Sequence, residues 1–274
     1  MIDGIDVVRV RTPTLPPATH TNSWIVGDSA LSVFDPASPW EDEQDRLARD
    51  LRDRVARGAT IERIVLTHHH PDHVGGATAL QHALSDLCHV PIEAHSLTAE
   101  LLAGQVTVDG FLGEGDQLVC GGVTLDIHHT PGHAPGHLIF VHQQTRAAIV
   151  GDMVAGVGTI AIAPEDGNLG AYLASLERMR TLDLTTLHPA HGPSLANPEA
   201  VLSHYIAHRH MRTDQIRAVL DKLGRATPLA LAGVVYAELP IGFHGLAAIQ
   251  VQSHLLWMQE HGMATVDGEL WQST

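Results

Sequence analysis

The chain has 274 residues, enough for one large domain or for one domain with a small appendage. Its formal net charge is −15, from 16 basic and 31 acidic residues, and this balance repels polyanions such as nucleic acids. The N-terminus carries early acidic residues and no long apolar run, and no stretch approaches the ~20 apolar residues of a membrane helix. We therefore expect a cytoplasmic protein that has no membrane partner.

The first half of the chain predicts three short strands, one helix and a fourth strand. The strands are expected at 5–12, 21–27 and 30–36, where β-prone residues stand between Pro and Gly turns. A helix is expected at 41–58, because Leu47, Leu51 and Val55 recur every four residues behind an acidic start. The strand at 61–67 is apolar enough to be buried.

The next stretch predicts a helix at 75–87, a hairpin within 117–133, and strands at 137–143 and 147–152. Another helix at 168–179 and a strand entering a loop at 185–193 follow. Helices and short strands thus mix, with polar loops at the strand ends. This pattern favours an α/β protein of four layers, in which two sheets carry helices on their outer faces.

The composition changes after residue 197. Asn197-Pro198-Glu199 is a typical helix start, and residues from about 199 to 261 predict three helices. Asp267-Gly268 then marks a hairpin. We predict a catalytic domain at 1–197 and a small winged-helix-like module at 198–274; the module holds five basic and seven acidic residues, a poor track for phosphates.

One loop concentrates possible metal ligands directly after the strand at 61–67. It reads "VLTHHHPDHVGG" and contains the pattern H-x-H-x-D-H, formed by His68, His70, Asp72 and His73. In an extended segment alternate residues point to the same side, so His68, His70 and Asp72 share a side while His69 faces away. With 21 histidines in the chain some clustering occurs by chance. However, imidazole and carboxylate at this spacing are what a divalent metal prefers.

Three later positions offer further ligands. His133 lies on the Gly-rich turn "HTPGHAPGH", Asp152 at a strand end in "AIVGDM", and His191 in the loop "HPAHGP". None is specific alone, since a Gly-Asp after a strand is usually only a turn. Together, and in this order, these motifs resemble the metallo-β-lactamase fold superfamily of dinuclear metal hydrolases. The resemblance implies an αββα sandwich with the metals at one sheet edge.

The resemblance also implies a ligand for every family position. It assigns two groups of three ligands and one bridging residue: His68, His70 and His133; Asp72, His73 and His191; and Asp152. We expect two zinc ions, with iron or manganese as alternatives. A hydroxide shared by the metals would attack the substrate, and Asp72 would orient it as a catalytic residue.

A closer resemblance exists to the lactamase-β-like subfamily with a C-terminal winged-helix segment. It is carried by "GDMVAGVGTIAIAPEDGNLGAYLASL", "PAHGP" and "YIAHRHMRTDQI". This subfamily includes a single-strand endoribonuclease and fungal thioesterases. The leading hypothesis is a hydrolase acting on an ester, thioester or lactone of a small molecule. Alternatives are a metal-dependent endoribonuclease, a mononuclear-iron sulfur dioxygenase and a winged-helix DNA-binding regulator. The sequence indicates no oligomeric state.

Four residues are candidate substrate contacts. His20 is expected near the mouth of the cleft because functional residues concentrate on loops. His208 and Arg209 would meet an anionic substrate end, although joining the module to the first domain is the favoured interpretation. Tyr172 is more typical of helix packing than of catalysis. His137 is expected either to support His133 or to pack in the core.

Overall fold

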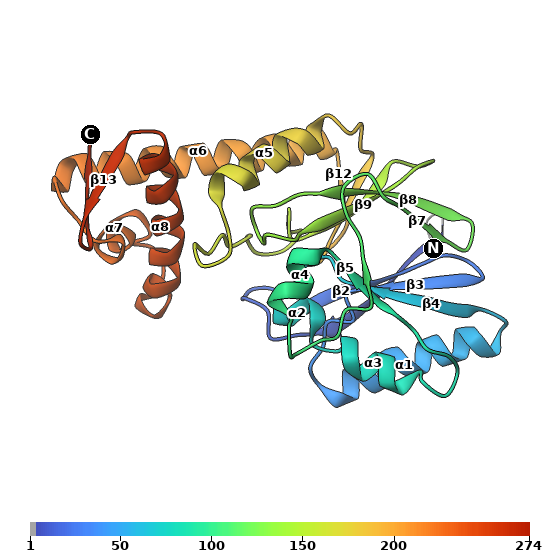
Figure 1. Cartoon of the computed structure of the whole chain (residues 1–274). Helices are drawn as coiled ribbons and strands as arrows, with labels where there is room; N and C mark the ends of the chain where they lie inside the picture. The colour runs from blue at the N-terminus through green and yellow to red at the C-terminus, as the bar shows by residue number, and fades with distance from the viewer. Residues whose placement is uncertain (1–3) are drawn as a thin grey trace.

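The computed structural model describes residues 4–274 and shows two β-sheets lying face to face, with helices outside (Figure 1). The first sheet has the strand order β1-β2-β3-β4-β5-β6 and the second the order β12-β11-β10-β9-β8-β7. The strands of the first sheet are β1 (Ile5–Arg11), β2 (His20–Val26), β3 (Ala30–Phe34), β4 (Thr60–Val65), β5 (Ile92–Ala94) and β6 (Gly110–Phe111). Those of the second are β7 (Gln117–Cys120), β8 (Val123–His129), β9 (Leu138–His142), β10 (Ala147–Gly151), β11 (Thr186–Pro189) and β12 (Leu195–Ala196).

Three apolar cores separate the four layers. Helices α1 (Glu41–Ala56) and α3 (Ala77–Ala83) bury Leu51 and Leu80 against the outer face of the first sheet. Between the sheets, Phe34 meets Phe140 edge to face at 4.9 Å between ring centroids. Helix α5 (Leu169–Arg180) covers the outer face of the second sheet. The predicted αββα sandwich is therefore confirmed.

The helix expected at 75–87 is observed as the shorter α3 (Ala77–Ala83), and an additional helical turn that was not expected precedes it. The structure has a short α2 (Pro71–Val74), then α3, with Gly76 between them. A Cβ atom on Gly76 would lie 2.6 Å from the carbonyl oxygen of Pro36, so only glycine lets the helix start this close to the neighbouring loop. No pattern in the sequence predicted the short helix α4 (Ser96–Leu101) or the strands β5, β6 and β12.

The C-terminal part lies beside the sandwich (Figure 1). It contains three α-helices, a 3-10 helix and a hairpin: α6 (Pro198–Leu223), α7 (Pro228–Val235), η1 (Ile241–Phe243), α8 (His244–Glu260), β13 (Ala264–Asp267) and β14 (Leu270–Ser273). Helix α6 belongs to two cores, because Leu202 and Ile206 pack under the second sheet whereas Ile216 and Leu220 pack in the module. The domain boundary at 197/198 stays a prediction, and residues 1–3 of the first predicted domain lie outside the described residues.

Among residues 4–274, no helix combines the length and the apolar composition that crossing a bilayer would require.

Candidate metal centre

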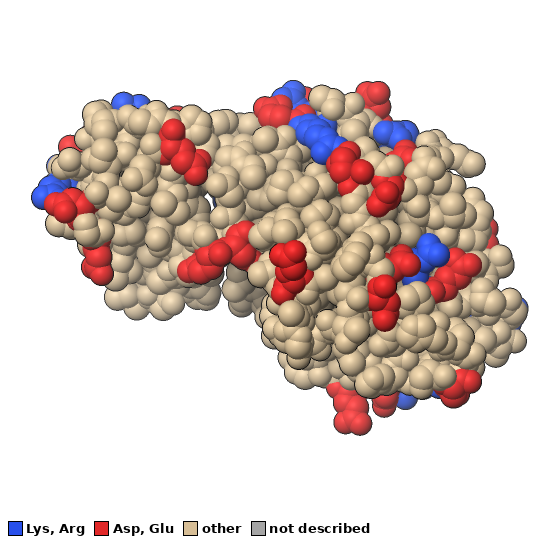
Figure 2. All heavy atoms as spheres, in the orientation of Figure 1, with Lys and Arg blue, Asp and Glu red and all other residues tan. Residues whose placement is uncertain are grey.

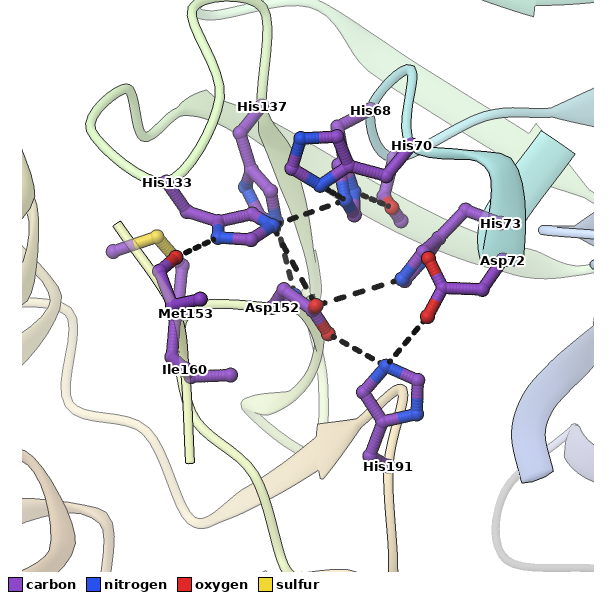
Figure 3. A network of polar contacts seen from close by, with 12 residues as sticks. His68, His70, Asp72, His73, His133, His137, Asp152, Met153, Ile160 and His191 are labelled. Atoms are coloured by element: carbon purple, nitrogen blue, oxygen red, sulfur yellow. Dashed lines mark hydrogen bonds and ion pairs between the residues drawn. The ribbon is translucent and has the colours of Figure 1, made fainter. Parts of the chain in front are cut away.

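Strand ends deliver the candidate ligands to one place. Strand β4 ends at Val65, just before His68, and Pro71 starts α2 so that Asp72 and His73 turn back toward it. Strand β10 ends at Gly151 and presents Asp152, while β11 leads into His191. Figure 3 shows these side chains pointing toward one another from separate elements, as the sequence predicts.

Three imidazole rings form the first group. His68 Nε2 lies 3.0 Å from His70 Nδ1 and 3.2 Å from His133 Nε2. Three neutral rings that turn one nitrogen each to a common point cannot all satisfy one another by hydrogen bonds, since each ring has a single N–H. Such a convergence of lone pairs is typical of a metal site.

The second group consists of Asp72, His73 and His191, whose ligand atoms all lie within 4.8 Å of one another. His191 Nε2 is 3.5 Å from Asp72 Oδ2.

Asp152 lies between the two groups, as Figure 3 shows. Its Oδ2 is 3.5 Å from His133 Nε2 and 3.6 Å from His73 Nε2, and its Oδ1 is 3.4 Å from His191 Nε2. This position matches the one expected of a bridging carboxylate.

Two buried atoms in the centre have no hydrogen-bond partner among residues 4–274. They are His73 Nε2 and Asp152 Oδ1. Leaving a buried polar atom unsatisfied costs about 1–3 kcal/mol. A divalent cation would satisfy both atoms at once, and the His and Asp donors are of the types that zinc binds. The residues present therefore fit the metals that the motif implies.

Burial and neighbouring charges set the protonation of the ligands. Burial lowers the pKa of His133 to about 4 and holds the pKa of His68 well below its ordinary value. Burial also opposes charge on Asp152, but His191 and His73 outweigh it and hold the pKa of Asp152 well below the usual range. Neutral imidazole and ionised carboxylate are the forms that bind a metal.

The second ring nitrogens of two histidines donate to backbone carbonyls. His133 Nδ1 donates to Ala161 O at 2.8 Å, and His191 Nδ1 donates to His20 O at 3.1 Å. Each bond fixes which nitrogen carries the proton and therefore which lone pair faces the centre.

Sequence reasoning missed Asp35, which supports the second group. Asp35 Oδ2 accepts from His73 Nδ1 at 2.9 Å, and its two oxygens accept from the amide and the hydroxyl of Thr67 at 2.8 and 2.7 Å. Burial opposes charge on His73, but Asp152 and Asp35 outweigh it and raise the pKa of His73 well above its ordinary value. An Asp between a buried strand and Pro36 was the available signal, but it is also typical of an ordinary turn.

Asp166 was missed as well. Its Oδ2 lies 3.0 Å from His70 Nε2 and 2.8 Å from His69 Nε2, on a loop whose sequence "PEDGN" predicts only a turn. Burial opposes the charge of this carboxyl, but hydrogen bonds from His69 and His70 hold its pKa far below its ordinary value. His69 thus turns to Asp166 and lies outside both ligand groups. It does not face away from His70, however, because both rings reach the same oxygen of Asp166.

His137 supports a different ligand from the one expected. Its Nε2 accepts from the backbone N–H of Asp152 at 3.1 Å, and its Nδ1 lies 3.0 Å from the hydroxyl of Thr130. It therefore holds Asp152 in place and makes no hydrogen bond to His133.

Two of the four candidate substrate contacts, Tyr172 and Arg209, have the structural roles that the sequence favoured and do not line the cleft. Tyr172 is fully buried and donates its hydroxyl to Met153 O at 2.7 Å, and Arg209 is only 5% exposed and donates to Ile160 O. Neither side chain lines the cleft. Both are buried beneath it and hydrogen-bonded to backbone carbonyls. His208 is half-buried on α6 and does not line the cleft, and only His20 faces a surface hollow beside it.

The cleft over the centre has a volume of about 220 Å³. Its walls beyond the candidate ligands are small or apolar and include Pro13, Leu15, Ala18 and Val157. Ala18 and Val157 also line an adjoining hollow of about 480 Å³, whose titratable side chains are Arg9, His20, Glu43 and Arg46.

Comparison with known proteins agrees with this geometry. Residues 16–191 match the family model described as the metallo-beta-lactamase superfamily. The beta-lactamase-like protein 2 homolog of Caenorhabditis elegans is 30% identical over 80% of this chain and 72% of its own length. Atrochrysone carboxyl ACP thioesterase AacuM of Aspergillus aculeatus is 28% identical over 82% of this chain and 68% of its own.

Two solved structures share the fold. A metallo-beta-lactamase family protein from Thermus thermophilus has a TM-score of 0.82 at 20% identity, covering 100% of this chain and 99% of its own. A beta-lactamase domain protein from Burkholderia ambifaria has a TM-score of 0.84 at 20% identity, covering 99% of this chain and 91% of its own. Both similarities extend over α6 to β14 as well as over the sandwich.

Proposed function

We propose that this chain, which belongs to the metallo-beta-lactamase superfamily, is a dinuclear zinc enzyme that hydrolyses an ester-type bond of a small molecule. The bond would be that of an ester, a thioester or a lactone. The observation that carries the proposal is the position of Asp152 between two groups of three donors. His68, His70 and His133 would hold one metal, Asp72, His73 and His191 the other, with Asp152 bridging.

When bound, zinc ions lower the pKa of water and polarise a carbonyl oxygen. Asp72 lines the cleft and is held by its backbone, since Thr21 Oγ1 donates to Asp72 O at 2.9 Å. Its carboxylate is positioned to orient the attacking water and to take its proton. Leu15 and Val157 give the cleft apolar walls, although both side chains are exposed to solvent.

The walls of the cleft favour an uncharged acyl group. Apart from the candidate ligands, no charged side chain lines it among residues 4–274. The adjoining hollow has Arg9 and His20, which would suit an anionic leaving group, whereas its Arg46 is already paired with Glu43, a carboxylate that lines the same hollow. A relative named as a thioesterase supports a thioester as the first substrate class to test.

The surface charge disfavours the ribonuclease alternative. On the face drawn in Figure 2, Lys and Arg stand mostly beside Asp or Glu, and no continuous basic track crosses it. An extended RNA needs several Lys or Arg contacts to phosphates, each of which adds a salt-dependent attraction. The net charge of −15 works against such binding.

A substrate panel tests the proposal. We expect two zinc ions per chain by elemental analysis and hydrolysis of a thioester, lactone or aryl ester that a chelator abolishes. We expect weak or absent binding of single-stranded RNA at physiological salt. A single iron per chain with no second metal would favour the sulfur dioxygenase. Tight RNA binding with cleavage that is lost in His68→Ala would make the ribonuclease the leading function.

A further inference from the structure

The segment Ile160–Ile162 lies between the metal centre and the C-terminal helices. Its middle residue, Ala161, accepts the 2.8 Å bond from His133 Nδ1. The carbonyls on either side turn the other way: Ile160 O accepts from Arg209 Nη2 at 2.5 Å, and Ile162 O accepts from Gln250 Nε2 at 3.3 Å. One short segment therefore joins a candidate metal ligand to α6 and to α8.

Helix α8 holds this segment in one register. The amide of Gln250 pairs with both backbone groups of Ile162, because Ile162 N also donates to Gln250 Oε1 at 3.0 Å. Ser253, one turn along the helix and 5% exposed, donates its hydroxyl to the same carbonyl. A two-bond pairing of this kind resembles the ladder of a β-sheet and fixes both the position and the rotation of the peptide.

Packing and a second contact reinforce the arrangement. Ile160 and Ile162 are 2% and 1% exposed and share a core with Leu202 of α6. The guanidinium of Arg209 lies over the ring of Tyr172, at 5.3 Å from Cζ to the ring centroid.

Tyr172 extends this contact to the bridging carboxylate. Its hydroxyl donates to Met153 O, one residue after Asp152, and Figure 3 shows Met153 and Ile160 beside His133 and Asp152. Two candidate ligands thus depend on contacts that start in α6 and α8.

We infer that the C-terminal helices position the metal centre: Arg209, Gln250 and Ser253 hold Ile160–Ile162 so that the Ala161 carbonyl fixes the ring of His133. These three are positioning residues and touch no substrate. The inference rests on the proposed function in that His133 is taken as a metal ligand. Groups that orient a ligating histidine affect how tightly the site binds its metal. A contact that only connects two parts of the chain would affect the free energy of unfolding but not the metal affinity.

The double variant Gln250→Ala/Ser253→Ala in the full chain separates these two roles. Zinc affinity is measured by adding the metal-free protein to a chromophoric chelator, which reports each of the two zinc equivalents. We expect one equivalent to bind about tenfold more weakly, at the low end for partners of a ligating histidine. His133→Ala should weaken the same equivalent further, which identifies the affected site.

Gln252→Ala is the matched control, because Gln252 is exposed on the same helix. Ser253→Ala alone removes one of the three bonds and should give a smaller decrease, so the test holds even if the double variant folds poorly. Unchanged affinities together with a lower melting temperature of the metal-free protein would overturn the inference. Wild-type protein that binds fewer than two zinc ions would instead overturn the proposed function.

Discussion

The metal centre and the contact of α6 and α8 with Ile160–Ile162 both bury polar side chains, and they do so in opposite ways. In the candidate metal centre, His73 Nε2 and Asp152 Oδ1 are buried, have no hydrogen-bond partner in the described part of the chain, and lie on facing groups. In the helix contact, the carbonyls of Ile160 and Ile162 both accept hydrogen bonds. Unsatisfied atoms that converge indicate a binding site for a cation, whereas satisfied atoms indicate support.

Arg209 is an exception in the contact of α6 and α8 with Ile160–Ile162, which we call the supporting region. Nε of Arg209 has no hydrogen-bond partner among residues 4–274, but the guanidinium lies over the Tyr172 ring. The face of an aromatic ring attracts a cation, so the ring stabilises the guanidinium and this unpaired atom does not indicate a binding site.

The largest expected effect comes from removing Asp152, the carboxylate on which both ligand groups converge. Asp152→Ala should reduce turnover of the preferred ester or thioester by about 100-fold or more, because both ligand groups lose their common carboxylate. His69→Ala should keep most activity, since His69 lies outside both groups and His70 still holds Asp166. Steady-state kinetics of the two zinc-loaded variants test this contrast. Equal losses would show that strand alternation does not separate His69 from the ligands.

The next effect concerns a residue that supports the centre from below. In Asp35→Asn the amide can still accept from Thr67 N but presents its NH₂ to His73 Nδ1, which carries the proton toward Asp35. We expect metal affinity to fall about 10–100-fold, as for other partners of ligating histidines. Zinc competition titrations measure it, with exposed Asp28→Asn as the control. An affinity equal to that of the wild type would remove Asp35 from the site.

The structure brings together the candidate ligands that the sequence named, whereas the sequence did not indicate the residues that support them. Ligands such as His68 and Asp72 stand in a dense motif whose spacing is set by an extended strand and a helix start. Asp35 and Asp166 were missed because each stands in a sequence typical of a turn, and their partners are 38 and 96 residues away along the chain. A local sequence pattern does not indicate contacts between residues so far apart in the chain.

The fold shows the same limit. The mixture of strand and helix patterns favours two sheets with helices outside, and the αββα sandwich that the family resemblance implies is observed. The sequence does not show that α6 belongs to two cores. Leu202 and Ile206 are spaced four residues apart, as are Ile216 and Leu220, yet the two pairs pack against different partners. Which partner a helix face meets is decided by tertiary packing.

A smaller effect is expected within the supporting region. Tyr172→Phe keeps the buried ring but leaves Met153 O without its donor. An unsatisfied buried carbonyl should lower the free energy of unfolding by about 1–3 kcal/mol. Urea denaturation measures this change. Tyr236→Phe is the control, because Tyr236 also stacks on an arginine, Arg212, but is only partly buried. A weaker zinc affinity without a lower free energy of unfolding would instead place Tyr172 in the metal centre.

The smallest expected effect is the pH dependence that His254 contributes to stability. His254 is 1% exposed on α8, and its Nδ1 lies 2.7 Å from the hydroxyl of Thr213. Burial lowers its pKa to about 3, and the charges of Arg209, Arg212, His208 and His210 act in the same direction. The unfolded chain binds a proton near pH 6.5, whereas the folded chain does not, so stability is fully present above pH 6.5 and falls as the pH drops toward 3.

Between pH 6.5 and 5.5 this single group should contribute a loss of about 1 kcal/mol. Other buried histidines, such as His188, add to the slope of the wild type, so the contribution of His254 is the difference from His254→Gln. Urea denaturation of both metal-free proteins at the two pH values gives that difference, and Gln should flatten the slope by about 1 kcal/mol although it lowers stability at pH 7. Parallel slopes would mean that His254 is protonated in the folded chain, and the supporting region would then hold a buried charge near its arginines. That result would remove the distinction drawn between the two regions, because a supporting region should keep its buried polar groups neutral or paired.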